Sequence, residues 1–112
     1  MRMPSNDERN LYSQLLVINR QAFTHAHYEV AYHALAAALH SAYDTGDQER
    51  LRDVQFIATS QRDWIDTHQP DHRLSTSSAR ARGQNSMFTM LERQAAAAGT
   101  LQLHRRSEMP DE

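Results

Sequence analysis

One segment constrains the fold more than any other: the alanine-rich stretch HYEVAYHALAAALHSAYDTGD, from His27 to Asp47. Advanced by about 100° per residue, as in an α-helix, its small and aliphatic side chains share one face. These are Ala31, Ala34, Leu35, Ala38 and Ala42. Larger side chains flank that face, with Val30 on one side and Tyr28, Tyr32, Leu39 and Tyr43 on the other.

The apolar arc of this helix covers roughly two hundred degrees, which is wider than packing against a single neighbour requires. Alanine side chains also let a second helix axis come to the near end of the usual ~8–10 Å range. We therefore expect this helix to be the hub on which the other helices pack.

The rest of the chain is predicted to be helical as well. Only three glycines and three prolines interrupt it, and runs of strand-forming residues are missing. We predict an all-α fold, a four-helix array or small bundle, with helices at about residues 5–23, 26–43, 48–67 and 84–98. The polar, weakly periodic residues 72–84 form either a loop or a short stretch of helix.

Several residues predict where these helices begin and end. Ser5 and Glu8 have the spacing of a capping box at the start of the first helix. Gly46 suits the left-handed conformation at the end of the second helix, and Asp47 suits the N-cap of the third. Pro70 stops the third helix, and Gly99 is expected to end the fourth.

Apolar periodicity predicts the buried face of each remaining helix. The expected faces are Leu11, Leu15, Ile18 and Ala22 in the first helix, Leu51, Val54, Ala58, Gln61 and Ile65 in the third, and Met87, Met90, Leu91 and Ala95 in the fourth. With 112 residues the chain fits one domain. We expect that domain at residues 5–103, between a disordered N-terminus (1–4) and a disordered tail (104–112).

Composition narrows the function classes. The chain has no cysteine, which excludes disulfides, thiolate nucleophiles and cysteine-ligated zinc. No apolar run is long enough for a signal peptide or a membrane span, so a cytoplasmic protein is expected. All twelve basic residues are arginine, which we interpret as the codon bias of a GC-rich bacterium.

A family resemblance follows from the pattern around the alanine-rich helix. The series Tyr28, Ala31, Leu35 and Ala38-Leu39, preceded by one helix and followed by Gly46-Asp47 and another, resembles the helix-turn-helix unit of tetratricopeptide repeats. The resemblance covers about residues 11–66, and no second copy follows in register. It implies antiparallel helix pairs. Because stacked repeats normally need three or more units, self-association is expected to complete the structure.

These features together predict a small helical protein–protein interaction module or accessory subunit, without catalysis or a cofactor. Its partner would be another protein or a second copy of the chain. The predicted contact residues are Tyr28, Tyr32, Leu39, Tyr43, Met87 and Met90. For the two methionines there is an alternative, since they could instead cover the core.

Histidines suggest a different function, a ligand- or metal-sensing domain. His25, Glu29, His33 and His40 lie on the polar face of the alanine-rich helix, where imidazole and carboxylate at i and i+4 could share a metal ion. The alternative is a solvated face on which Glu29 pairs with His33. A second group, Asp66, His68, Asp71 and His72, surrounds Pro70, whose ring interrupts the helical spacing.

A third alternative is weak nucleic-acid binding through the arginine-rich C-terminal third. Residues 73–106 contain six arginines and one acid, Glu92. The arginines are Arg73, Arg80, Arg82, Arg93, Arg105 and Arg106. Phe88 is the only aromatic residue in this segment, so stacking on single strands is poorly supported. No motif of a hydrolase, nucleotide-binding or zinc-protease site is present, which argues against an enzyme.

Overall fold

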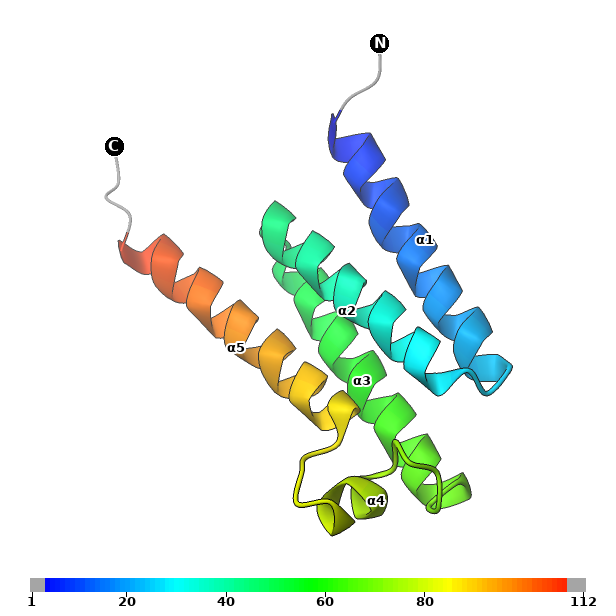
Figure 1. The fold of residues 1–112 in the computed structure, drawn as a ribbon. Coiled ribbons are helices and arrows are strands. Elements are labelled where there is room, and N and C mark those ends of the chain that lie inside the picture. The colour runs from blue at the N-terminus through cyan, green and yellow to red at the C-terminus, as the bar shows by residue number, and fades with distance from the viewer. Residues whose placement is uncertain (1–3, 109–112) are drawn as a thin grey trace.

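The computed structural model describes the backbone of residues 4–108 and the side chains of residues 11–103. Its five helices are α1 (Pro4–Thr24), α2 (Tyr28–Thr45), α3 (Gln48–His68), α4 (Thr76–Ala81) and α5 (Met87–Glu108). The described residues contain no strand, so the all-α prediction is confirmed. The four long helices alternate in direction along the chain and form a small bundle, with α4 at one end (Figure 1).

The alanine-rich helix α2 is the hub of this bundle, because it contacts α1, α3 and α5. Ala31 and Ala38 are 0% exposed and Ala34 is 8% exposed, which confirms the predicted packing face. The helices form two antiparallel pairs, α1 with α2 and α3 with α5 (Figure 1).

Two clusters of buried side chains make up the core. The larger one joins α1, α2, α3 and α5 through Tyr12, Leu35, Ala38, Leu39, Ala42, Leu51, Val54, Ala58, Leu91 and Ala95. The smaller one lies near α4 and consists of Tyr28, Ile65, Leu74 and Phe88. All five residues of the predicted α3 face are buried, so that prediction is confirmed.

The predicted face of α1 is wrong by about one residue. Leu11 and Ile18 are 52% and 45% exposed, whereas the neighbouring Tyr12 and Asn19 are buried. Asn19 can occupy the central position because its side chain is hydrogen-bonded inside the core. Apolar periodicity does not predict this position, because an amide is polar. Leu15 and Ala22 are half-buried, as their place beside the true face requires.

The two tight turns between the first three helices use the same backbone geometry. Gly46 ends α2 with φ of 69°, and the Asp47 side chain accepts a hydrogen bond from the Arg50 backbone N–H, as predicted. In the α1–α2 turn the left-handed residue is Ala26, with φ of 64°. This turn places the start of α2 at Tyr28 instead of the predicted Ala26.

The stretch whose structure the sequence left open contains a turn followed by the short helix α4. Ser75 caps α4 by accepting a hydrogen bond from the Ser78 N–H, and its hydroxyl donates to the Pro70 carbonyl oxygen at 2.6 Å. Leu74 is 3% exposed and anchors the turn in the smaller core cluster. The serine-rich composition thus supplies caps and turn bonds.

The last helix differs most from the prediction. It begins at Met87 instead of residue 84, and it passes through Gly99 to Glu108, so the predicted end at residue 98 and the predicted disorder of residues 104–108 are wrong. A Cβ built at Gly99 would lie 3.3 Å from the Gln48 Oε1, so glycine serves close packing on α3 at this position. Residue 4 likewise belongs to α1, and the disorder predicted for residues 1–3 and 109–112 lies outside the described residues.

The buried face of α5 also needs correction. Leu91 and Ala95 are buried as predicted, but Met87 is half-buried and Met90 is 47% exposed. Phe88 is 0% exposed and takes the central place in the contact with α3 and α2. Among the described residues, no helix combines the length and apolarity needed to cross a membrane.

Candidate functional site

A largely apolar groove lies between α2 and α5, which run alongside each other in the same direction (Figure 1). Its volume is about 450 Å³. The lining residues, which define the α2–α5 groove, are Leu39, His40 and Tyr43 from α2 and Gln94, Ala97, Ala98 and Leu101 from α5. Leu39 is 5% exposed and belongs to the core, whereas Leu101 is 49% exposed.

Helical spacing places the α5 residues of the groove on one stripe. Gln94, Ala97 and Leu101 follow one another at i, i+3 and i+7, and Met90 lies one turn earlier on the same stripe. The short side chains of Ala97 and Ala98 keep that wall low. The sequence did not identify these α5 residues as a site. Gln94, Ala97 and Ala98 lie within the predicted helix but outside its predicted apolar face, and Leu101 lies beyond its predicted end.

The groove has no permanent charge. None of its seven lining residues is Asp, Glu, Lys or Arg. Amide side chains fix the end of the groove near Tyr43 and Leu101. Gln102 donates from Nε2 to the Tyr43 carbonyl oxygen, and Gln48 donates from Nε2 to the Gly99 carbonyl oxygen at 3.2 Å. These bonds tie α2, α3 and α5 together, so the walls of the groove are held in place.

The structure divides the six predicted contact residues. Tyr28 and Leu39 are 4% and 5% exposed, so little of either side chain is open to a partner. Tyr28 is enclosed because its ring packs against Phe23 at 5.0 Å and His72 at 4.9 Å between centroids. Leu39 remains part of the groove as its floor.

The other four predicted residues keep some exposure. Tyr43 is half-buried and lines the groove. Tyr32 is also half-buried, with its ring edge-on to Phe88 at 5.9 Å. Met87 packs against the smaller core cluster, which favours its role in covering the core. Met90 is 47% exposed and continues the α5 wall toward the start of that helix.

The histidine face of α2 does not assemble a metal site. No group of three or more potential ligands able to hold a metal ion occurs within the described part of the chain. His25 is bonded through Nδ1 to the Gln21 carbonyl oxygen at 2.8 Å. Glu29 forms an ion pair with Arg73, and its Oε2 lies 4.0 Å from the His33 Nε2. His40 is exposed two turns away, beside the groove.

The group around Pro70 has structural roles instead. Asp66 accepts hydrogen bonds from the Thr76 N–H at 2.7 Å and the Thr76 hydroxyl at 2.6 Å, which docks α4 on α3. His72 accepts from the Leu74 N–H at 3.0 Å, and His68 stacks on Trp64 at 4.4 Å. These contacts build the turn and the start of α4.

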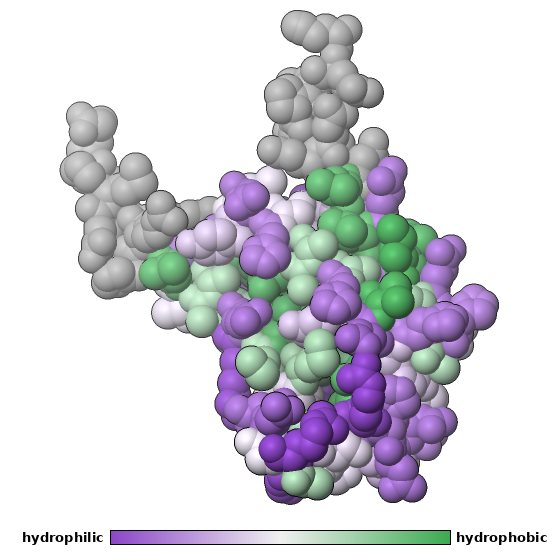
Figure 2. Space-filling model, in the orientation of Figure 1, coloured by the Kyte–Doolittle hydropathy of each residue, from purple (hydrophilic) through white to green (hydrophobic). Residues whose placement is uncertain are grey.

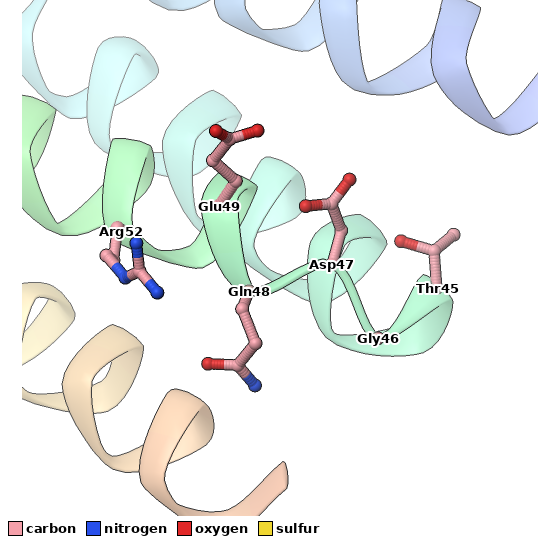
Figure 3. Close-up of a pocket in the computed structure, with 6 residues that line it drawn as sticks. All are labelled: Thr45, Gly46, Asp47, Gln48, Glu49 and Arg52. Atoms are coloured by element: carbon pink, nitrogen blue, oxygen red, sulfur yellow. The ribbon is translucent and has the colours of Figure 1, made fainter. Parts of the chain in front are cut away.

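Three further hollows differ in chemistry from the groove. The largest of the three, about 520 Å³, lies at the α2–α3 turn, and its lining includes the polar or charged residues Thr45, Asp47, Glu49 and Arg52 (Figure 3). One between α1 and α3, about 390 Å³, has the Asn19 and Gln61 amides at its floor and Arg20 at its edge. A third, about 290 Å³, lies between α3 and α5 and contains Arg52 and three other polar side chains.

Hydrophobic surface also occurs outside the hollows. In Figure 2 a continuous hydrophobic area lies over part of α1, and paler apolar residues alternate with polar ones over α2 and α5. The exposed aliphatic side chains of α1 include Leu11, Val17 and Ile18. The α2–α5 groove differs from these surfaces because it is both concave and uncharged.

No protein-family model, curated protein or solved structure matches this chain.

Proposed function

We propose that this chain is a small helical protein-interaction module without catalytic activity, and that the α2–α5 groove is its contact surface. The observation that carries the proposal is a concave, uncharged groove of about 450 Å³ with a half-exposed leucine, Leu101, at its end. Grooves of this kind between two helices suit the apolar stripe of a third helix, which inserts side chains at i, i+3 or i+4, and i+7.

We further propose a second copy of this chain as the occupant. In a two-fold symmetric dimer the same surface meets itself, so any charge in it would face a like charge across the axis. The groove has none. The exposed Leu101 and Met90 of one copy would fill the groove of the other, over the low walls formed by Ala97 and Ala98.

The tetratricopeptide resemblance supports the same function without deciding it. Two antiparallel helix pairs are fewer than the three units that a stack of repeats normally needs, so a second copy would extend the array. A cytoplasmic location is part of this proposal and is based on composition.

Light scattering coupled to size-exclusion chromatography tests the proposal over a range of protein concentrations. The wild-type chain, of 12.9 kDa, is expected to approach twice that mass as its concentration rises. Leu101→Glu places a charge in the groove and is expected to keep the chain monomeric. Phe56→Glu is the matched control, because Phe56 is 72% exposed on α3 and lies outside the groove.

Two outcomes would contradict the proposal. A wild-type chain that stays monomeric at every concentration removes the second copy as the occupant. A dimer that persists in Leu101→Glu but dissociates in Phe56→Glu places the interface on the outer face of α3. Circular dichroism of both variants shows whether the fold is retained.

A further inference from the structure

A polar hollow lies between the C-terminal half of α3, the short helix α4 and the beginning of α5. Its volume is about 280 Å³. The lining residues, which define the arginine pocket, are Arg62, Asp66, Thr76, Arg80, Gln84, Asn85, Ser86, Thr89 and Arg93. Three different helices thus each contribute one arginine to a single concave site.

The three arginines are not equivalent. Arg62 donates to Glu92 at 2.9 Å and to Asp63 at 3.1 Å. Burial acts against the charge of Arg62, but the two carboxylates outweigh it and raise its pKa. Arg62 is therefore a fixed cation at the wall of the pocket. Within residues 11–103, the side chains of Arg80 and Arg93 have neither an ion-pair nor a hydrogen-bond partner.

The other arginines of the C-terminal third contrast with these two. Arg73 is paired with Glu29, and Arg82 donates to the Arg73 carbonyl oxygen at 3.0 Å and to Gln84 at 3.3 Å. The side chains of Arg105 and Arg106 lie outside the described residues. Among the described arginines of the C-terminal third, the two without a side-chain partner therefore both line the arginine pocket.

Neutral donors complete the pocket. Gln84 uses its Oε1 to accept from Arg82, which leaves its amide N–H groups available. The Thr89 hydroxyl oxygen accepts from Arg62 at 3.4 Å, which leaves its proton available. The one carboxylate in the lining, Asp66, already accepts two hydrogen bonds from Thr76, one at each oxygen.

We propose that the arginine pocket binds a tetrahedral oxyanion, either inorganic phosphate or the phosphate group of a small phosphomonoester. Guanidinium groups bind phosphate oxygens through paired charge-assisted hydrogen bonds, and Arg80 and Arg93 supply two such groups from different helices. The volume of the site, about 280 Å³, favours a small anion. A nucleic-acid backbone would need a longer row of unpaired cations than these two.

Titration of the ¹⁵N-labelled chain with sodium phosphate tests this inference, with sodium chloride adjusted to keep the ionic strength constant. We expect saturable chemical-shift changes confined to the lining residues, including the backbone amides of Ser86 and Thr89. The variant Arg80→Gln/Arg93→Gln is expected to bind phosphate at least about ten-fold more weakly than the wild-type chain, since it loses two charged donors.

Arg52→Gln is the matched control. Arg52 is exposed on the same helix as Arg62, but it lines other hollows. It is expected to bind phosphate as the wild-type chain does. Equal weakening in Arg52→Gln and in the double variant would overturn the proposal, because it would indicate diffuse attraction to net positive charge.

Glycerol 3-phosphate and a short DNA duplex distinguish the sources of the anion. Tighter binding of glycerol 3-phosphate than of phosphate identifies a phosphomonoester ligand, and the reverse order identifies inorganic phosphate. Shift changes no larger than those in sodium chloride alone would overturn the proposal. The proposal would also be overturned if neither small anion gave a saturable response and the wild-type chain and the double variant bound the duplex equally well. None of these measurements depends on the α2–α5 groove.

Discussion

The two helix pairs of this bundle are held together by different chemistry. Where α1 meets its neighbours, the centre of the contact is an amide: Asn19 donates to the Ala31 carbonyl oxygen of α2 at 2.7 Å and exchanges hydrogen bonds with Gln61 of α3 at 3.1 and 2.7 Å. Where α5 meets α3 and α2, the centre is apolar, with Phe88 and Leu91 at 0% exposure.

This difference separates two ways of specifying a helix contact. Hydrogen bonds between buried amides are directional, so a one-residue slip of α1 would leave the Asn19 and Gln61 side chains without their partners. Apolar side chains specify a contact through shape and volume, and they tolerate small shifts better. Placing α1 thus depends on a few bonds, whereas placing α5 depends on filling space.

The largest effect is expected in the apolar contact. Phe88→Ala should lower the free energy of unfolding by about 3–5 kcal/mol, because it removes the largest fully buried side chain and leaves a cavity. Urea denaturation followed by circular dichroism measures this change. Phe56→Ala, at a 72% exposed position, should have little effect. Similar losses in the two variants would mean that Phe88 is not central to the core.

The next effect concerns Tyr12, which links α1 to α3. Its hydroxyl donates to the Arg50 carbonyl oxygen at 3.3 Å, and its ring lies 4.6 Å from the Arg50 guanidinium. Burial, and then the charge of Asp53, raise the pKa of Tyr12 from 10.0 to about 12, against the opposing effect of Arg50. The folded chain therefore holds this proton more tightly than the unfolded chain does.

The contribution of Tyr12 to the free energy of unfolding should therefore be fully present below pH 10. It should decline between pH 10 and about 12, where only the unfolded chain loses the Tyr12 proton. Above about pH 12 the free energy of unfolding should have fallen by about 2–3 kcal/mol through this proton. The absence of lysine removes the other common side chain that titrates in this range. In Tyr12→Phe the decline measured by urea denaturation should be smaller, and an unchanged decline would assign it to other tyrosines.

A double-mutant cycle tests the amide contact directly. Asn19→Leu should cost about 1–3 kcal/mol, because it leaves the Gln61 side chain buried without its partner and removes the second hydrogen bond to the Ala31 carbonyl oxygen. Gln61→Leu should cost a similar amount. The double variant should cost less than the sum of the two, since it removes both amides of the pair together. Strict additivity would show that the two side chains do not act as a unit.

The smallest effect is expected in the two turns that share left-handed geometry. Ala26→Gly in the α1–α2 turn should stabilise the chain by about 1 kcal/mol, because glycine avoids the clash of a Cβ in this conformation. Gly46→Ala in the α2–α3 turn should destabilise it by a similar amount, although open space surrounds that position. Thermal denaturation of both variants measures the two shifts, and the same sign in both would refute the explanation.

The sequence predicted the parts of the fold that depend on periodicity and turn chemistry. The buried faces of α2 and α3, the left-handed Gly46 and the cap at Asp47 all follow from local patterns. The face of α1 could not be predicted, because Asn19 becomes a core residue only through partners that are 12 and 42 residues away in the chain. The turn at Ala26 carries no glycine to mark it.

The candidate site was predicted only in part, for a related reason. Tyr43 and Leu39 were identified from α2, but their partners on α5 lie near or beyond a glycine that usually ends a helix. The arginine pocket could not be predicted either. Its three arginines lie 18 and 13 residues apart in sequence order, and they converge because Asp66 docks the short helix α4 on α3.

Gly99 gives this bundle a coupling between its core and its surface. A side chain at that position would lie 3.3 Å from the Gln48 Oε1 and would displace the amide that donates to the Gly99 carbonyl oxygen. The same amide donates to Gln102, so the hydrogen bonds that hold this end of α5 beside the groove would weaken although none of the groove's lining had been altered. Affinity for a partner would then respond to a substitution on the opposite side of the helix.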